Sequence, residues 1–317
     1  MKLKDIYAFF IKEGIKSDLR TNKQIEARLQ EKKKEYRKLP QGLKKYFDKE
    51  SFKNPYSDTR ILFGDPDVDV NSVMIGIDIG VEEVLLADQL SKNGNKIDLV
   101  ISHHPEGHAY AGLYDVMHLQ ADILCNIGID KDIAESFMEK RIGEVERKIH
   151  GANHEKAVDA ARLLGVPLMS CHTPADNHVA NYLQKLMDKN KPATLKNVID
   201  LLLKEPEYRE AFLNKSGPKI FSGKEKNKAG RVFVDMTGGT QGSSEIYGRM
   251  SQLGIKTTLC MHVSEASRKK MKNDHIDVVV AGHIASDNLG INLLLDKLNK
   301  KTKLRIYECS GFRRVKR

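Results

Sequence analysis

The sequence has few cysteines and no long apolar run, and each shortage excludes a class of protein. The cysteines are far apart and form no CxxC pair, so neither a disulfide framework nor a cysteine zinc site is expected. No run of 18 apolar residues suggests a membrane span, and the charged start MKLKDIYAFFIKEG is unlike a secretory signal peptide. We therefore expect a cytoplasmic protein with no membrane contact.

The positive charge of the chain is concentrated near its N-terminus. The net charge is +10 over 317 residues, and residues 1–60 hold 17 Lys and Arg against 9 Asp and Glu. Such a field can attract nucleic acid or another polyanion. The segment shows no alternation of aromatic and basic residues of the kind that stacks bases. We interpret it mainly as a solvated helical arm, with nucleic-acid binding as the weaker alternative.

From residue 61 onward, short apolar runs alternate with amphipathic helical segments. This alternation is typical of α/β proteins, here mainly parallel sheets covered by helices. A length of 317 residues allows one large domain or two of medium size. We predict a basic helical N-terminal extension (1–60), a first α/β half (61–187), an insertion or linker (188–230) and a second α/β half (231–317).

Most predicted strands end in a side chain suited to binding a metal ion. In parallel sheets, ligands bind outside the carboxyl ends of the strands. Imidazole and carboxylate together favour zinc, iron(II) or manganese. Neighbouring strand residues point to opposite faces, so a histidine doublet serves two ions, or one ion and a supporting contact, more readily than it binds one ion with both rings. The strands predicted at 72–80, 96–104, 166–173, 256–263 and 276–283 end in or near Asp78, His103 with His104, His172 with Asp176, His262, and His283 with Asp287.

The spacing of these residues suggests roles for them. Asp176 follows His172 by four residues with a proline between, so a turn can return its carboxylate to bridge two ions. His283 and Asp287 share one face of a helical turn. We expect His172 and Asp78 to support the ligands, although Asp78 could instead cap a helix.

Two further features of the sequence are candidates for catalysis and anion binding. His262 and His108 are the candidates for proton transfer, with a structural histidine equally plausible for His262. Thr237, Gly238 and Gly239 in DMTGGTQGSSE could present backbone amides to an anion. That segment fits neither nucleotide-binding glycine motif, and a tight structural turn is the main alternative.

An ordered set of motifs resembles the NIF-three-like family (NGG-one-interacting factor three). The segments are IGIDIGVEEVLLADQL, DLVISHHP, CHTPAD, RVFVDMTGG and VVVAGHIASDN, and the resemblance covers roughly residues 61–185 and 217–310. It implies a dinuclear metal centre and a homo-oligomer, commonly a hexameric ring; some members carry the name GTP cyclohydrolase I type 2. The ligands that it implies are His103, His104, Asp176, His283 and Asp287.

This chain departs from the family pattern in three places. Asp287 stands where the family usually has Glu, which is longer by one methylene group. The 72 positions from His104 to Asp176 exceed the usual length, so we expect inserted helices there. The basic N-terminal segment is also unlike the start of typical members.

The sequence leads to three functional hypotheses. The first is a hydrolase with two divalent ions per chain (zinc, iron or manganese), acting on a phosphoester, nucleotide or cyclic amide-like substrate. The second is a non-catalytic scaffold that holds metal or binds proteins. The third and weakest is nucleic-acid binding through the N-terminal segment. A DHH-type phosphoesterase is disfavoured, because Ser102 rather than Asp precedes the histidine doublet.

Overall fold

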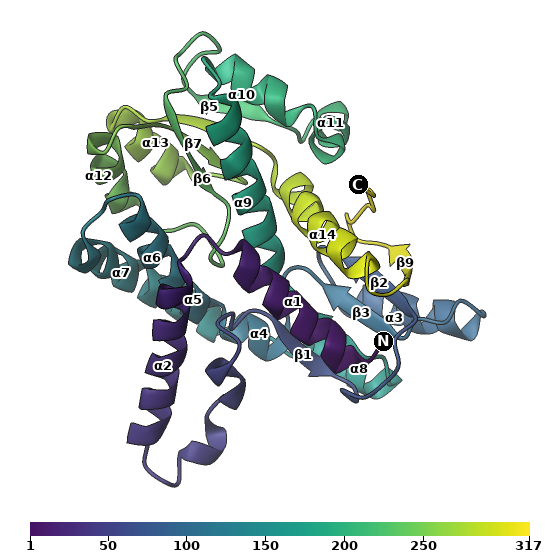
Figure 1. Cartoon of the computed structure of the whole chain (residues 1–317). Coiled ribbons are helices and arrows are strands. Elements are labelled where there is room, and N and C mark those ends of the chain that lie inside the picture. The colour runs from purple at the N-terminus through teal and green to yellow at the C-terminus, as the bar shows by residue number, and fades with distance from the viewer.

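The computed structural model describes residues 1–317, which form two separate β-sheets (Figure 1). Both sheets are parallel except for one antiparallel strand at an edge, β1 in the first and β5 in the second. The predicted α/β class with mainly parallel sheets is therefore confirmed. The first sheet has the order β1 (Arg60–Phe63), β4 (Leu168–Ser170), β3 (Leu99–Ser102), β2 (Ser72–Gly76), β9 (Arg305–Glu308), and the second β5 (Lys219–Ser222), β8 (Asp277–Val280), β7 (Ile255–Cys260), β6 (Arg231–Asp235).

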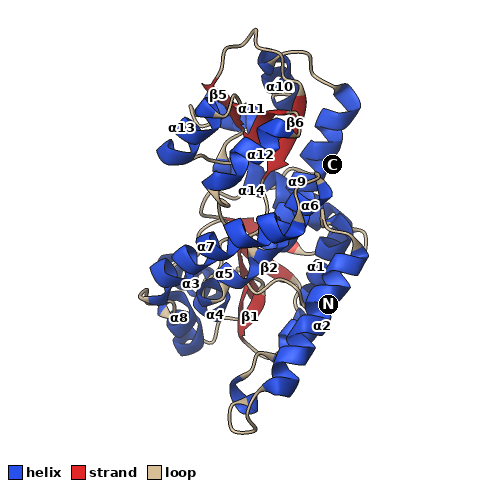
Figure 2. Ribbon diagram, turned by 90° about the vertical axis from the view of Figure 1, so that its left-hand side faces the viewer, coloured by secondary structure: helices blue, strands red, loops and turns tan.

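Helices surround both sheets and fill the space between them (Figure 2). None of them combines the length and the apolar character needed to span a membrane. The α-helices are α1 (Leu3–Ser17), α2 (Asn22–Lys38), α3 (Val81–Lys92), α4 (Gly107–Ala111), α5 (Leu113–Val116), α6 (His118–Asn126), α7 (Lys131–His150), α8 (Lys156–Leu164), α9 (Thr173–Asn190), α10 (Leu195–Leu202), α11 (Pro206–Leu213), α12 (Tyr247–Gln252), α13 (Glu265–Asn273) and α14 (His283–Asn299), and the 3-10 turns are η1 (Lys44–Tyr46), η2 (Lys49–Phe52) and η3 (Ser244–Ile246).

The two halves of the chain repeat one plan. In each half an antiparallel edge strand precedes three parallel strands, and a long helix follows the last of them: α9 after β4 and α14 after β8. These two helices pack against each other in the middle of the molecule. Both begin with the same polar pattern, HTPADN at 172–177 and HIASDN at 283–288. The repeat therefore brings two His-x-x-x-Asp turns into one region.

The central strands are buried on both faces, as their sequences require. Every residue of β2 and of β3 is buried, because helices cover both sides of the sheet. Continuous apolar runs are typical of strands in this setting. The parallel arrangement then sends β2, β3 and β4 toward the same edge, where the candidate metal ligands begin.

The N-terminal segment is only partly the solvated arm that we expected. Leu3, Ile6 and Phe10 of α1 are buried, and α1 packs on α9 and α14, so for this helix the interpretation was wrong. The sequence analysis missed the apolar face of α1 because it considered the net charge of residues 1–60 as a whole. In contrast, α2 buries only Ile25 and projects from the body with the turns that follow it (Figure 1).

Two strands cross the boundaries that we predicted between the parts of the chain. β5 lies inside the predicted insertion but pairs with β8 of the second sheet. β9 lies inside the predicted second half but pairs with β2 of the first. Both are four-residue edge strands that are largely exposed or half-exposed, so they lack the apolar signal of the central strands.

Candidate metal centre

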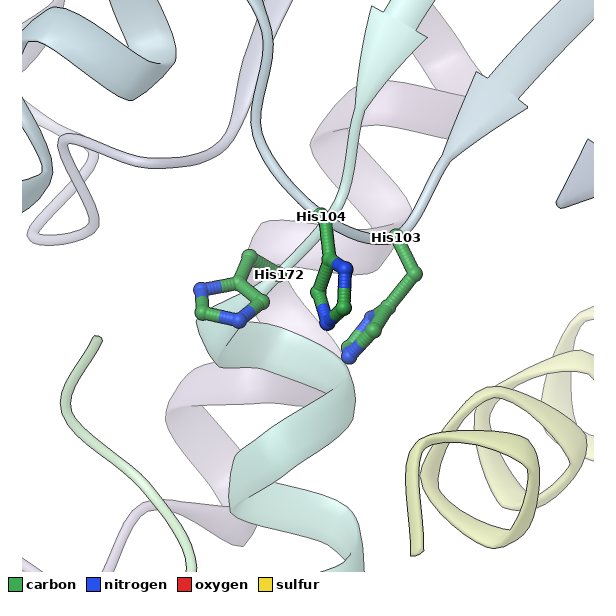
Figure 3. Close-up of side chains that lie close together, drawn as sticks. All are labelled: His103, His104 and His172. Atoms are coloured by element: carbon green, nitrogen blue, oxygen red, sulfur yellow. The ribbon is translucent and has the colours of Figure 1, made fainter. Parts of the chain in front are cut away.

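Three segments that are distant in the sequence deliver imidazole and carboxylate groups to one place between the two halves. The turn after β3, the start of α9 and the start of α14 each contribute two of these residues. Figure 3 shows three of the imidazole rings gathered beside the start of α9. The six residues are His103, His104, His172, Asp176, His283 and Asp287.

Asp287 lies between the neighbouring histidines. Its Oδ1 is 3.4 Å from His103 Nε2, and its Oδ2 is 3.5 Å from His104 Nε2. The same Oδ2 is 3.7 Å from His283 Nε2. One carboxylate thus faces three imidazole nitrogens, with a different oxygen toward each member of the doublet.

Asp176 occupies the buried side of the cluster. Its Oδ1 is 3.5 Å from His103 Nε2 and its Oδ2 is 3.6 Å from His172 Nε2. Three overlapping groups have donor atoms close enough to share an ion, within 4.8 Å of one another. They are His103 with His104 and His172, His104 with His283 and Asp287, and His103 with Asp176 and Asp287.

The buried polar atoms of this cluster have no hydrogen-bond partners in the protein. They are His103 Nε2, Asp176 Oδ1 and both carboxylate oxygens of Asp287. An unsatisfied buried polar group costs about 1–3 kcal/mol, and more if it is charged. The carboxylate oxygens and deprotonated imidazole nitrogens repel one another unless a proton or a cation lies between them. The donor set therefore fits divalent metal ions.

The outer nitrogens of three histidines are held by oxygen atoms. His103 Nδ1 lies 3.2 Å from the carbonyl of Cys171, and His104 Nδ1 lies 2.7 Å from Asp78 Oδ1. His172 Nδ1 lies 2.9 Å from Asp58 Oδ2. An oxygen acceptor keeps the proton on Nδ1 and leaves the Nε2 lone pair directed inward, as in many metal-binding histidines.

Asp58 was missed by the sequence analysis. It precedes the short edge strand β1, which has no strong strand pattern, and its partner His172 lies 114 residues further along the chain. Nothing in the local sequence relates the two residues, because their contact is created by the pairing of β1 with β4.

Without a bound ion, the pKa shifts of the clustered residues show that the site favours positive charge. Burial raises the pKa of Asp176 well above its usual value, and the charge of Asp287 adds to the rise. Burial opposes ionisation of Asp287 too, but the neighbouring imidazoles of His103 and His104 outweigh it and lower its pKa. Burial likewise works against His104, yet Asp287 and Asp78 raise its pKa to about 9. In the absence of metal, protons thus take the place of cations.

His262 and His108, the candidates for proton transfer, lie in different places. The His262 ring is 4.9 Å from that of His283, and both line the open groove described below. His108 does not line that groove. Burial and the charge of Arg60 lower its pKa, and the charges of Asp48 and Glu155 partly oppose this.

The glycine turn lies beside the metal-binding groups, and the side chain of Gln120 on α6 holds its backbone. Thr237 and Gly239 line a small cavity that His172 and His262 also line. The amide of Gln120 on α6 donates to the carbonyls of Gly238, at 2.8 Å, and Thr240, at 2.7 Å. The turn thus has a structural anchor, and anion binding by Thr237, Gly238 and Gly239 stays a prediction.

An open groove of about 580 Å³ leads from the surface to the cluster. Its walls include the start of α3, the segment from His104 to Glu106, and Lys156 of α8, and it reaches His262 and His283. The side chain of His283 is 39% exposed and that of His104 is 25% exposed, whereas His103, Asp176 and Asp287 are buried. One side of the cluster is therefore open to a small ligand and the other is closed.

Among solved structures, the chain resembles a NIF3 superfamily protein from Sphaerobacter thermophilus, with 25% identity and a TM-score of 0.69 over 80% of this chain and 91% of that one. The chain has a NIF3 fold. The resemblance inferred from the motifs is thereby confirmed. The chain is also similar, more loosely, to HcgD from Methanocaldococcus jannaschii (16% identity, TM-score 0.49, 78% of this chain and 87% of that one) and to a Bacillus cereus protein related to NIF3 (11%, 0.40, 79% and 90%). No family model and no curated protein matches the sequence.

Proposed function

We propose that this protein is a hydrolase that uses two divalent metal ions. The observation that carries the proposal is the set of buried, unpartnered donor atoms at the closed end of an open groove. Unpartnered polar atoms explain why cations belong there, and the groove explains how a substrate reaches them. Zinc, iron and manganese suit the mixed imidazole and carboxylate donors.

The donor groups divide into two positions that share one residue. His103, Asp176 and Asp287 would hold the buried ion, and His104, His283 and Asp287 would hold the outer one. The sequence analysis gave the bridging role to Asp176. The distances favour Asp287 instead, because its two oxygens face different members of the histidine doublet.

Two ions in these positions would activate a water molecule and neutralise the charge that develops on the substrate. Two other side chains near these positions would have supporting roles. Asp78 holds the His104 ring, and His262 on the groove wall is placed to exchange a proton with a bound ligand. The polar groove suits a phosphoester, a nucleotide or a cyclic amide-like substrate.

The test joins metal content to turnover. Purified wild type should contain about two ions per chain by elemental mass spectrometry, and His104→Ala should lose an ion together with turnover of a phosphoester or nucleotide substrate. Full activity in a metal-free variant would refute the proposal. A metal-holding or protein-binding scaffold is the alternative, and it would be supported by two firmly bound ions with no turnover in such a screen.

We also propose that the chain forms a homo-oligomer, with a hexameric ring as the specific expectation. The support is three exposed leucines on the adjacent helices α3 and α8: Leu85 and Leu86 are each 45% exposed and Leu163 is 74% exposed. Light scattering at several concentrations measures the state directly. A monomer at every concentration would remove the proposal.

Because α1 packs on α9 and α14, the candidate surface for nucleic-acid binding in the N-terminal segment is α2 and the turns after it. Arg28 and Lys32 are paired with Asp115, at 2.7 and 2.9 Å, which leaves the other basic residues of α2 as the candidates. Binding that weakens steeply with added salt would support this weaker candidate.

A further inference from the structure

A buried pair of residues, Asp58 and His172, adjoins the metal-binding groups and has no part in the centre proposed above. Asp58 has no exposed surface. Its Oδ2 accepts hydrogen bonds from His172 Nδ1, at 2.9 Å, and from the Thr173 hydroxyl, at 2.6 Å. A fully buried carboxylate thus fixes the orientation of one imidazole.

The orientation given by Asp58 points the other nitrogen of His172 at the cluster. With the proton on Nδ1, the Nε2 atom carries a lone pair, and it faces Asp176 Oδ2 at 3.6 Å. Neither atom can donate to the other. The ring of His172 lies 4.9 Å from that of His103, with the ring of His104 close by (Figure 3).

His172 therefore has the same arrangement as the two members of the doublet. In all three residues Nδ1 meets an oxygen acceptor and Nε2 points inward. The Cys171 carbonyl serves His103, Asp78 serves His104, and Asp58 serves His172. Such outer contacts orient metal ligands and raise their basicity. A histidine that only supported the fold would not need its free lone pair beside a carboxylate.

We propose that His172, oriented by Asp58, is a further metal ligand that binds the buried ion together with His103, Asp176 and Asp287. The donor atoms of His172, His103 and His104 lie within 4.8 Å of one another. The inference rests on the metal centre proposed above and extends its ligand set. The buried position then has four protein donors, as in closed sites, and the outer position has three and keeps room for a substrate.

The test measures zinc affinity rather than activity. Competition with a chromogenic chelator gives the two dissociation constants for wild type, His172→Ala, Asp58→Asn and the double variant. We expect Asp58→Asn to weaken the tighter constant about 10-fold, within the range found when outer contacts of metal ligands are removed. His172→Ala removes the ligand itself, so it should weaken that constant more, by about 100-fold. If Asp58 acts through His172, the double variant should bind zinc no more weakly than His172→Ala. His118→Ala, a half-buried histidine near Arg28 and Asp115, is the matched control.

Circular dichroism and thermal unfolding show whether each variant is folded. If His172→Ala does not fold, the nearly isosteric Asp58→Asn with Co²⁺ decides: its visible absorption should differ from that of the wild type, because the coordination of the buried ion changes. Unchanged zinc affinity in folded His172→Ala would overturn the proposal, as would an unchanged Co²⁺ spectrum. An equal loss from Asp58→Asn with and without His172 would overturn the role of Asp58. Wild type without any metal would instead refute the proposed function itself.

Discussion

The two halves of the molecule share a backbone plan but contribute unequal chemistry. The amide of Cys171 donates to Ser102 O in the first half, and the amide of Ala281 donates to Cys260 O in the second. Met261 and His262 therefore stand in the second half where His103 and His104 stand in the first. At these two positions the first half has two histidines. The second half has one histidine and a methionine, whose thioether coordinates hard divalent ions poorly.

A similar difference appears one strand further along. Gly76 pairs with Ser102 and Asp235 with Cys260, so Asp78 and Thr237 hold matching positions two residues later. Asp78 contacts His104, whereas the Thr237 hydroxyl donates to Asn177 Oδ1 at 2.6 Å. The first half is equipped to orient ligands. The second half supplies the shared carboxylate Asp287 and the wall of the groove.

The largest effect should come from removing the carboxylate that the second half contributes. Asp287→Ala should lose both ions, because each candidate position uses this residue, whereas Asp176→Ala should lose only one. Elemental mass spectrometry per chain measures this, with Asp188→Ala, an exposed carboxylate at the far end of α9, as the control. Equal losses in the two variants would remove the distinction between a shared and an unshared carboxylate.

The dependence of stability on pH should differ between the metal-free and metal-loaded protein. The folded pKa of His104 is about 9 without metal, against 6.5 as its ordinary value. A raised pKa stabilises the metal-free fold below about pH 6.5, and this contribution is lost as the pH rises through 9. An ion replaces that proton, so the gain in Tm on adding zinc should grow from pH 6.5 to 9. Calorimetry at several pH values measures it, and a gain that stays constant would contradict the assignment.

Removing Gln120, the anchor of the glycine turn, should lower the stability of the fold without lowering its metal content. Gln120→Ala deprives the buried Gly238 carbonyl and the half-buried Thr240 carbonyl of their donor, which should lower the free energy of unfolding by about 1–3 kcal/mol. Urea unfolding measures the change, and Gln252→Ala on the exposed side of α12 should have almost no effect. A loss of metal in Gln120→Ala would mean that the turn itself helps to form the centre.

The smallest effect on metal content should come from His262, the counterpart of His104. His262→Ala should keep both ions, whereas His104→Ala should lose the outer one, because His262 belongs to none of the candidate ligand groups. The same elemental measurement compares the two variants. Loss of an ion from His262→Ala would make the halves more alike than their geometry suggests.

The sequence predicted those features that depend on local pattern. The helix at 81–92 and the buried central strands follow from periodicity and apolar runs, and the strand-end rule predicted that His103, Asp176 and Asp287 would meet. The preference for Asp287 over Asp176 as the proposed bridging carboxylate could not be predicted in this way, because it depends on which oxygen faces which ring. Asp58 could not be found either, because its role arises from a strand pairing more than 100 residues apart in the chain.

The course of the chain through both sheets also constrains how it can be made. After completing the second sheet, the chain returns to place β9 beside β2, and Phe312 just beyond it is fully buried. During synthesis, β2 therefore remains uncovered at this edge of the first sheet until β9 has been made. The first half therefore depends on a segment that follows the second half to cover its edge. Removing residues 305–317 would expose β2, the strand beside β3 and the histidine doublet, while leaving every proposed ligand in the chain.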